Sequence, residues 1–153
     1  MRNDLCVLVA EDEPDDVYLL QVAFEDAGIR NPMHVVPDGA EAINYLSGSE
    51  KYRDRTEFPF PALLILDLKM PRKTGLDVLA WLRNDGAARY VPVIVFSSSA
   101  HPSDVTKAYD LGANAFVVKP SGMAERNEFA KMIKGFWLTL NVPPPETSSG
   151  EEA

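Results

Sequence analysis

Four groups of reactive side chains in this 153-residue sequence stand directly after short apolar runs. They are the acidic run Glu11-Asp12-Glu13, the acid Asp67, the serine run that begins at Ser97, and the amine of Lys119. Each group alone has an ordinary structural explanation, because Asp and Ser often cap helices or form turns and short motifs are weak evidence. Together they are suited to phosphoryl transfer, in which a carboxylate attacks while a cation, an amine and a hydroxyl hold the phosphoryl oxygens.

The concentration of carboxylates in such a site predicts a bound cation. Two carboxylates about 4 Å apart repel each other by roughly 4 kcal/mol at an effective dielectric of about 20, and a metal ion offsets that cost. Oxygen ligands suit Mg2+, which keeps several waters and also binds phosphate oxygens. The two His and the single Cys form no cluster that would indicate zinc, so magnesium is the expected ion.

These residues can act together only if the fold brings them to one place, and the apolar pattern predicts such a fold. Apolar runs at 5–10, 35–36, 62–66, 91–96 and 115–118 are typical of strands. Segments of helical period lie near 14–27, 38–47, 74–85, 102–111 and 124–140. Several runs are apolar throughout, which suits a parallel sheet with helices on both faces. We therefore expect a doubly wound α/β fold, whose ligands bind beyond the carboxyl ends of five strands.

Composition limits the domain organisation and the partners. We expect one domain over 1–140 and a disordered tail rich in Pro, Ser and Glu at 141–153, with a solvated surface loop at 48–61. The formal charge of -8 and the lack of a basic stripe argue against nucleic acid as a partner. The sequence shows neither a secretory signal nor an apolar run of about 18 residues, which predicts a cytoplasmic protein without a membrane span. Cys6 is expected to be a small buried side chain.

Four motifs, by their order and spacing, resemble those of a CheY-like response-regulator receiver domain. They are Val-Ala-Glu-Asp-Glu-Pro at 9–14, Leu-Ile-Leu-Asp-Leu-Lys-Met-Pro at 64–71 with Gly75 four residues on, Pro-Val-Ile-Val-Phe-Ser at 92–97, and Gly-Ala-Asn-Ala-Phe-Val-Val-Lys-Pro at 112–120. The resemblance covers about residues 4–140 and implies a flavodoxin-like sheet of order 2-1-3-4-5. Residues 15–20, the long loop before the third strand, residues 71–75 and Trp137-Leu138 resemble the phytochrome-associated single-domain regulators of that family.

The resemblance implies the roles of the acidic residues. Asp67 would accept a phosphoryl group from the phosphohistidine of a sensor histidine kinase, for which a bacterial phytochrome is one candidate. Asp12 and Asp67 would ligate Mg2+ directly, Glu11 would do so through water, and the backbone carbonyl of Lys69 would be a further ligand. The protein would assist its own phosphorylation and dephosphorylation without being an enzyme that turns over a substrate.

The resemblance also implies how the signal leaves the site. Ser97 and Lys119 would hold phosphoryl oxygens, and Phe116 would be the switch that turns inward when Ser97 moves. Phe116 stands where Tyr is common, so its inward position needs no hydrogen-bond partner. Pro120 would hold the following turn, and a cis peptide bond is one way of doing so.

The expected output is altered association with another protein, whose identity the sequence leaves open. One candidate is a homodimer through the side that runs from the fourth strand to the fifth helix, with Tyr109, Trp137 and Leu140 on its surface. Trp137 and Leu140 also have the simpler interpretation that they cover the sheet.

Two alternative functions stay open. A magnesium-dependent phosphohydrolase with an Asp nucleophile would also combine an Asp, a hydroxyl and a Lys on an α/β sheet. Such enzymes usually carry a second acid two residues after the nucleophile, where this sequence has Lys69. A degenerate receiver domain that only docks partners would have lost part of the site, whereas all the expected residues are present here.

Overall fold

The computed structural model describes residues 4–85 and 88–145, within which strands and helices alternate along the chain. The strands are β1 (Val7–Ala10), β2 (Met33–Val36), β3 (Leu63–Leu66), β4 (Val93–Ser97) and β5 (Ala115–Val118). The α-helices are α1 (Pro14–Asp26), α2 (Gly39–Ser47), α3 (Gly75–Asn84), α4 (Pro102–Asp110) and α5 (Met123–Met132). A 3-10 helix, Glu50–Tyr52, follows α2, and a π-helix, Ile133–Leu140, continues α5.

The strands form a single parallel sheet in the order β2-β1-β3-β4-β5. The chain therefore moves outward from β1 in one direction to reach β2 and in the other direction to reach β3. This reversal makes the carboxyl ends of β1 and β3 the topological switch point, where ligands bind in such sheets. The predicted doubly wound, flavodoxin-like fold and its strand order 2-1-3-4-5 are confirmed.

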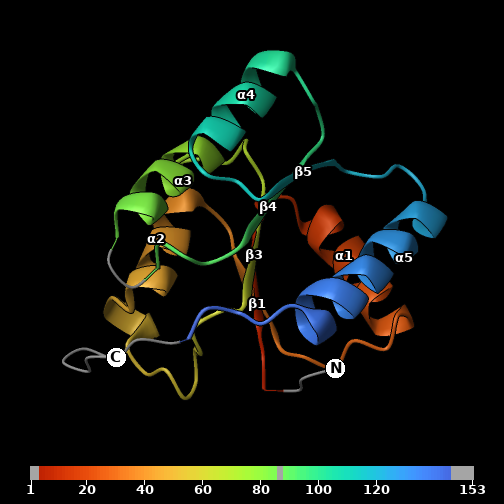
Figure 1. Cartoon of the computed structure of the whole chain (residues 1–153), viewed down its shortest axis with the longest axis horizontal. Helices are drawn as coiled ribbons and strands as arrows, with labels where there is room; N and C mark the ends of the chain where they lie inside the picture. The colour runs from red at the N-terminus through yellow and green to blue at the C-terminus, as the bar shows by residue number, and fades with distance from the viewer. Residues whose placement is uncertain (1–3, 86–87, 146–153) are drawn as a thin grey trace.

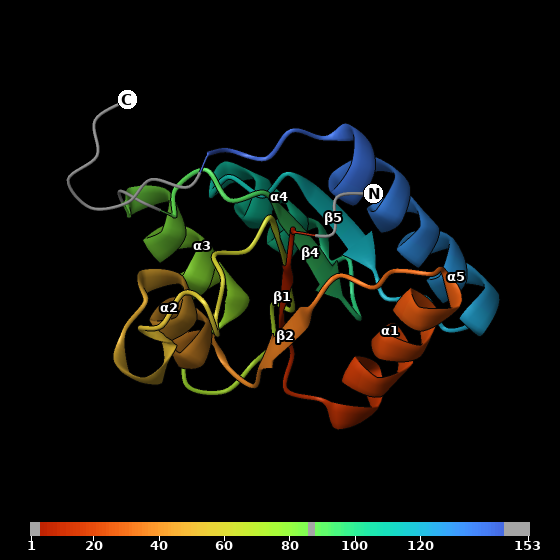
Figure 2. The ribbon, with the colours of Figure 1, turned by 90° about the horizontal axis from the view of Figure 1, so that it is seen from below.

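Helices cover both faces of the sheet, so the protein has two apolar cores. Alternate strand residues point to opposite faces: Leu8 and Leu64 belong to the core beneath α2, α3 and α4. Val9 and Ile65 belong to the core beneath α1 and α5. Figure 1 shows α2 and α3 on one side of the strands and α1 and α5 on the other, and Figure 2 shows the same layers from below. All four residues are nearly inaccessible to solvent, as fully apolar strand runs require.

The helices begin with the signals that the sequence carries. Pro14 occupies the first turn of α1, where its missing N–H costs no hydrogen bond. The side chain of Asp38 accepts a hydrogen bond from the Glu41 N–H at 2.8 Å and caps α2. Thr74 and Asp77 form a reciprocal capping box at the start of α3. Because a helix follows each strand, the first turns of α1 and α3 are brought to the carboxyl edge of the sheet.

The connection 48–61 differs from the expected solvated loop. Tyr52 is only 5% exposed, and Phe58 packs against the core beneath α2 and α3. The rings of Tyr52 and Phe58 lie 5.1 Å apart in an edge-to-face arrangement. The guanidinium of Arg55 donates a hydrogen bond to the Leu46 carbonyl at 2.9 Å, which ties the loop to the end of α2. The expectation was therefore wrong for the aromatic residues, which extend the core.

Three further expectations concern the C-terminal part of the chain. The helix predicted over 124–140 is present, but its second half is π-helical, and the Asn141 N–H donates to the Phe136 carbonyl at 2.7 Å. No described peptide bond is cis, so the suggested cis bond before Pro120 is wrong. Residues 141–145 have neither helix nor strand, and residues 142–145, with residues 59–62, line a hollow of about 330 Å³. The rest of the predicted disordered tail lies outside the described residues.

Candidate functional site

Three carboxylates meet at the switch point of the sheet. Glu11 directly follows β1 and Asp67 directly follows β3, and these strands pair with Ala10 opposite Leu66. The Asp67 N–H donates to the Ala10 carbonyl at 3.0 Å, which continues the pairing to the acids themselves. Glu11, Asp12 and Asp67 offer carboxylate oxygens that all lie within 4.8 Å of one another. The clustering expected from the strand ends is therefore present, and Glu11 and Asp67 are 5% and 6% exposed.

The ammonium group of Lys119 lies among these acids. Its Nζ is 2.7 Å from Glu11 Oε1, 2.9 Å from Asp16 Oδ2 and 3.2 Å from Asp67 Oδ2. The backbone N–H of Lys119 donates a hydrogen bond to the Ser97 carbonyl at 2.7 Å, which fixes Lys119 beside the end of β4. All three N–H bonds of the ammonium group therefore have a carboxylate within hydrogen-bond distance.

Of the other expected residues, Ser97 and Lys69 lie at this edge of the sheet, whereas Phe116 lies within β5. Ser97 ends β4 and is 1% exposed. Phe116 pairs with Val95 across β4 and β5 and is partly buried against the core beneath α2 to α4. Lys69 is exposed, and its N–H donates to Asp67 Oδ1 at 3.3 Å. The ligand role of the Lys69 carbonyl and the switch role of Phe116 stay predictions.

Electrostatics favours a cation in this site. The pKa of Glu11 is raised to about 7, because burial, with a smaller contribution from the nearby charge of Asp67, outweighs the opposing hydrogen bond from Lys119. For Lys119, burial lowers the pKa, but the hydrogen bonds to Glu11 and Asp16 outweigh it and raise the pKa above its ordinary value. Lys119 is therefore charged at neutral pH. The carboxylates still outnumber it, and their all-oxygen donor set fits Mg2+, Ca2+ or Mn2+.

Two close backbone approaches position the loop that carries Asp67. The Gly75 N–H donates to the Leu68 carbonyl at 3.0 Å, and a Cβ at Gly75 would overlap the Asp67 carbonyl oxygen and lie 2.8 Å from the Leu68 Cα. The Gly39 N–H donates to the Lys73 carbonyl at 3.1 Å, and a Cβ there would overlap that carbonyl oxygen. Glycine is required at both places because backbone meets backbone.

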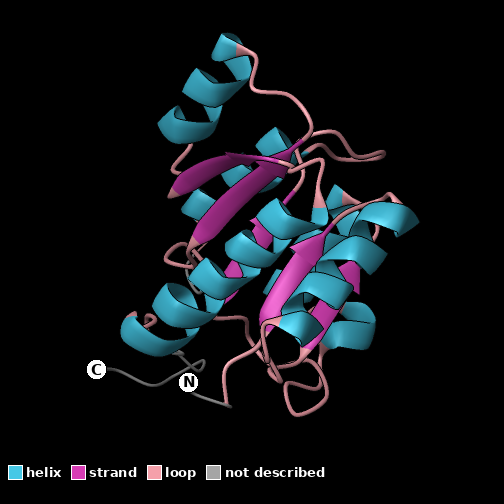
Figure 3. Ribbon diagram, turned by 90° about the vertical axis from the view of Figure 1, so that its right-hand side faces the viewer, coloured by secondary structure: helices cyan, strands magenta, loops and turns pink. Residues whose placement is uncertain are grey.

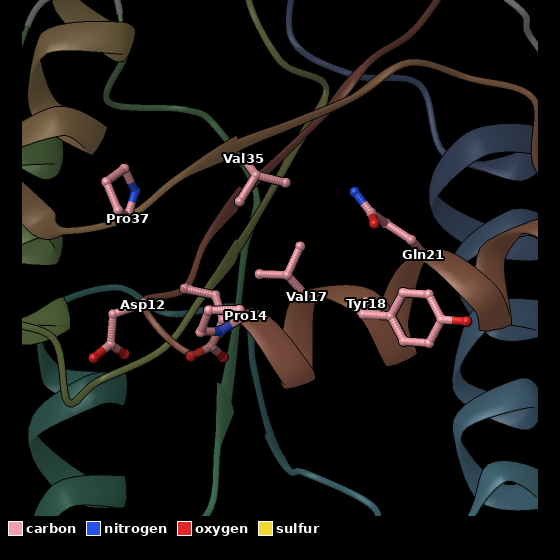
Figure 4. Close-up of a pocket in the computed structure, with 8 residues that line it drawn as sticks. Asp12, Pro14, Val17, Tyr18, Gln21, Val35 and Pro37 are labelled. Carbon is pink, nitrogen blue, oxygen red and sulfur yellow. The ribbon is translucent and has the colours of Figure 1, made fainter.

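An open hollow of about 330 Å³ adjoins the acids, between α1 and β2 (Figure 4). Asp12 lies at one end of this hollow, and the ring of Tyr18 projects from α1 at the other. Tyr18 and Val35 are 64% and 37% exposed, so the approach to the acids from this side is partly apolar.

Sequence reasoning missed two residues of the site. Asp16 stands in the first turn of α1, where an acid complements the helix dipole, but its carboxylate also contacts Lys119 and lies 3.6 Å from Arg126 Nη2. Arg126 belongs to α5 and is 6% exposed. The available signal was the position of Asp16 on the first turn of a helix that begins at the carboxyl edge of the sheet. No comparable signal marks Arg126, because its place depends on how α5 packs on α1.

Residues 7–133 match the response regulator receiver domain family. This chain belongs to that family. Receiver domains of this family are generally signalling modules, and the relatives of this one include phytochrome-associated single-domain regulators. Within the described residues, no helix is long and apolar enough to cross a membrane.

Three relatives resemble this receiver domain along almost its whole length. Response regulator Rcp1 of Synechocystis is 29% identical over 90% of this chain and 92% of its own, and the Mn2+-bound structure of Rcp1 superposes with a TM-score of 0.82. The phosphorylated cyanobacterial phytochrome response regulator RcpA is 30% identical, covers 92% of this chain and 99% of its own, and has a TM-score of 0.84. RPA3017, a response regulator in red light signalling of R. palustris, is 36% identical with the same coverage and a TM-score of 0.86.

Proposed function

We propose that this receiver domain accepts a phosphoryl group on Asp67 from the phosphohistidine of a sensor histidine kinase, with Mg2+ bound, and signals through altered protein association. The observation that carries the proposal is the position of Asp67. Its buried carboxylate lies within 4.8 Å of the acids Glu11 and Asp12 and 3.2 Å from the ammonium group of Lys119. A nucleophile, a metal-binding acid pair and a cation for the phosphoryl oxygens thus occupy one site.

In the proposed transfer, an oxygen of Asp67 forms a bond to phosphorus while the bond from phosphorus to the histidine nitrogen breaks. The N–H of Lys69 and the ammonium group of Lys119 donate to different oxygens of Asp67, so they orient the carboxylate before the reaction. Lys119 and the hydroxyl of Ser97 then bind phosphoryl oxygens. Mg2+ held by Glu11, Asp12, Asp67 and the Lys69 carbonyl would neutralise negative charge on the phosphoryl group.

The relatives support the finer parts of this proposal. Rcp1 binds Mn2+, a hard divalent cation that takes the same oxygen ligands as Mg2+. RcpA is described as phosphorylated and as a phytochrome response regulator, and RPA3017 acts in red light signalling. A bacterial phytochrome is therefore our candidate for the kinase, in the cytoplasm, where such a kinase would present its phosphohistidine.

The test is phosphorylation of the full chain by acetyl phosphate, a small phosphodonor, with and without Mg2+, followed by intact-protein mass spectrometry. We expect one phosphoryl group in wild type with Mg2+, none in Asp67→Asn, and normal uptake in Asp110→Asn, whose acid is exposed at the end of α4. The proposal fails if Asp67→Asn is phosphorylated as fast as wild type. Repeated hydrolysis of small phosphomonoesters without a stable phosphorylated form would instead indicate the phosphohydrolase.

For the output, we propose self-association through the α4, β5 and α5 side. Tyr109, Val118 and Met123 on these elements are 49%, 47% and 37% exposed, so the face offers apolar area to a second copy. Leu140 is 73% exposed, whereas Trp137 packs against the core and contributes less than the sequence suggested. Analytical ultracentrifugation before and after phosphorylation tests this surface. A monomer in both states would exclude it.

A further inference from the structure

A chain of alternating charges leads from the phosphoacceptor to the junction of α1 and α5. Lys119 Nζ lies 3.2 Å from Asp67 Oδ2 and 2.9 Å from Asp16 Oδ2, and Asp16 Oδ1 lies 3.6 Å from Arg126 Nη2. We call these four residues, Asp67, Lys119, Asp16 and Arg126, the ion-pair chain. Its last two members come from α1 and α5, which pack side by side (Figures 1 and 3). The ion-pair chain therefore connects the site to α5, to which we assign no metal ligand.

Lys119 has no N–H to spare for a phosphoryl oxygen. Its three carboxylate partners, Glu11, Asp16 and Asp67, lie at 2.7, 2.9 and 3.2 Å and match its three donors. Glu11 and Asp67 belong to the acid cluster, and their side chains are 4% and 7% exposed. Asp16 lies outside that cluster and its side chain is 25% exposed. Asp16 is therefore the partner that Lys119 gives up at least cost, because water can replace part of its solvation.

Arg126 is placed to take up the carboxylate that Lys119 releases. Its side chain is buried, and Nη1 has no hydrogen-bond partner within the described parts of the chain. At 3.6 Å, the contact of Nη2 with Asp16 is an ion pair longer than a normal hydrogen bond. A buried donor without an acceptor is unfavourable, so a small movement of Asp16 toward Arg126 would shorten the Nη2 contact to a hydrogen bond and bring an acceptor nearer to a guanidinium group that has an unsatisfied N–H.

We propose that Asp16 competes with the phosphoryl group for Lys119 and moves to Arg126 when Asp67 is phosphorylated. Asp16 and Arg126 are positioning residues in this scheme, since neither touches the reacting atoms. The inference rests on the proposed function, because it needs phosphorylation of Asp67. Its consequence is that the charge added at Asp67 tightens the contact between α1 and α5.

The first test observes Arg126 directly. The 15N-labelled full chain is phosphorylated with acetyl phosphate and Mg2+, and the Arg126 guanidinium N–H signal is assigned by comparison with Arg126→Gln. We expect this signal to shift and to exchange more slowly with water after phosphorylation of wild type and of Asp15→Asn. In Asp16→Asn it should not respond. Asp15 is the matched control, because it is the neighbouring acid on the same turn and is exposed.

The second test is a rescue that a purely structural role would not give. In Arg126→Gln, Asp16 has no cation to move to and keeps its hold on Lys119. The concentration of acetyl phosphate that gives half-maximal phosphorylation should then rise by about tenfold, the effect typical of losing one charge-assisted hydrogen bond. Adding Asp16→Asn removes the competitor and should restore the wild-type response, whereas adding Asp15→Asn should not.

The outcomes separate this inference from the proposed function. If wild type takes up no phosphoryl group at Asp67, both fail. If wild type is phosphorylated but the Arg126 signal does not change, or if Asp16→Asn gives no rescue, the inference alone is wrong. Should Arg126→Gln fold poorly, the Arg126 side-chain signal is assigned by through-bond correlation to its own backbone in 13C,15N-labelled wild type, and the measurement on wild type, Asp15→Asn and Asp16→Asn still decides the matter.

Discussion

Replacing Gly75 by Ala should destabilise the protein, whereas the same change at Gly135 should stabilise it. At Gly75 the new Cβ would meet backbone atoms of Asp67 and Leu68, which cannot rotate away as a side chain can. Such overpacking costs about 1–3 kcal/mol in the free energy of unfolding. At Gly135, in the exposed part of the π-helix, a Cβ would meet nothing within 4 Å. Helix propensity alone should then add about 1 kcal/mol of stability.

The two alanine variants should therefore differ by about 2–4 kcal/mol in the free energy of unfolding, or roughly 5–15 °C in Tm. Urea unfolding followed by circular dichroism measures the difference, provided that both variants keep the wild-type m-value. Gly39→Ala provides a second comparison, because its Cβ would overlap the Lys73 carbonyl and its three nearest atoms would all belong to Lys73. Gly39→Ala should lose stability as Gly75→Ala does, but its Asp67 should be phosphorylated faster than that of Gly75→Ala. Equal stability of Gly75→Ala and Gly135→Ala would refute the close-approach argument.

Three further variants test the supports of the site and the loop. Thr74→Ala removes the capping box with Asp77 and should cost about 1 kcal/mol by urea unfolding, with little effect on phosphorylation; an unchanged midpoint would argue against the cap. In wild type, the 2.7 Å hydrogen bond from Tyr52 lowers the pKa of the Glu41 carboxyl, and Tyr52→Phe removes this bond. Because a lowered carboxyl pKa stabilises the fold above the unfolded pKa, the wild-type advantage should be about 1 kcal/mol at neutral pH and should shrink as the pH falls below about 4. A pH-independent difference would show that Glu41 is not involved. Asp12→Asn should weaken Mg2+ binding by about tenfold or more in a calorimetric titration, and equal affinity would exclude Asp12 as a ligand.

The sequence predicts the sheet well because strand order and ligand position follow from local patterns. Short apolar runs such as Leu63–Leu66, placed between segments of helical period, are typical of strands buried on both faces, and the acids that follow two such runs then meet at one edge. The sequence does not predict how the connection at 48–61 folds. Tyr52 and Phe58 are separated there by charged residues without a period, and their burial depends on α2 and on each other. Packing between distant segments leaves no local signal.

The same reasoning explains why the sequence predicts the positions of Lys119 and Asp67 in the ion-pair chain but not those of Asp16 and Arg126. Lys119 and Asp67 stand at strand ends, so sheet topology alone brings them together. Asp16 and Arg126 stand on helices, and their meeting depends on the packing of α5 against α1, which follows from shape complementarity over two apolar faces.

The two routes by which phosphorylation could reach the surface lie on opposite faces of the sheet. Phe116 packs against the core beneath α2 to α4, so a movement of Ser97 and Phe116 would act on the α4 side. Arg126 lies on α5, so a movement of Asp16 would act on the α1 side. Both routes begin at the phosphoryl group, one at its contact with Ser97 and the other at its contact with Lys119. Because the sheet separates them, one modification can change the two faces independently, and substitutions at Phe116 and Arg126 need not affect each other. A partner that binds the α4 side and a partner that binds the α1 side could thus respond to the same phosphorylation with different sensitivity.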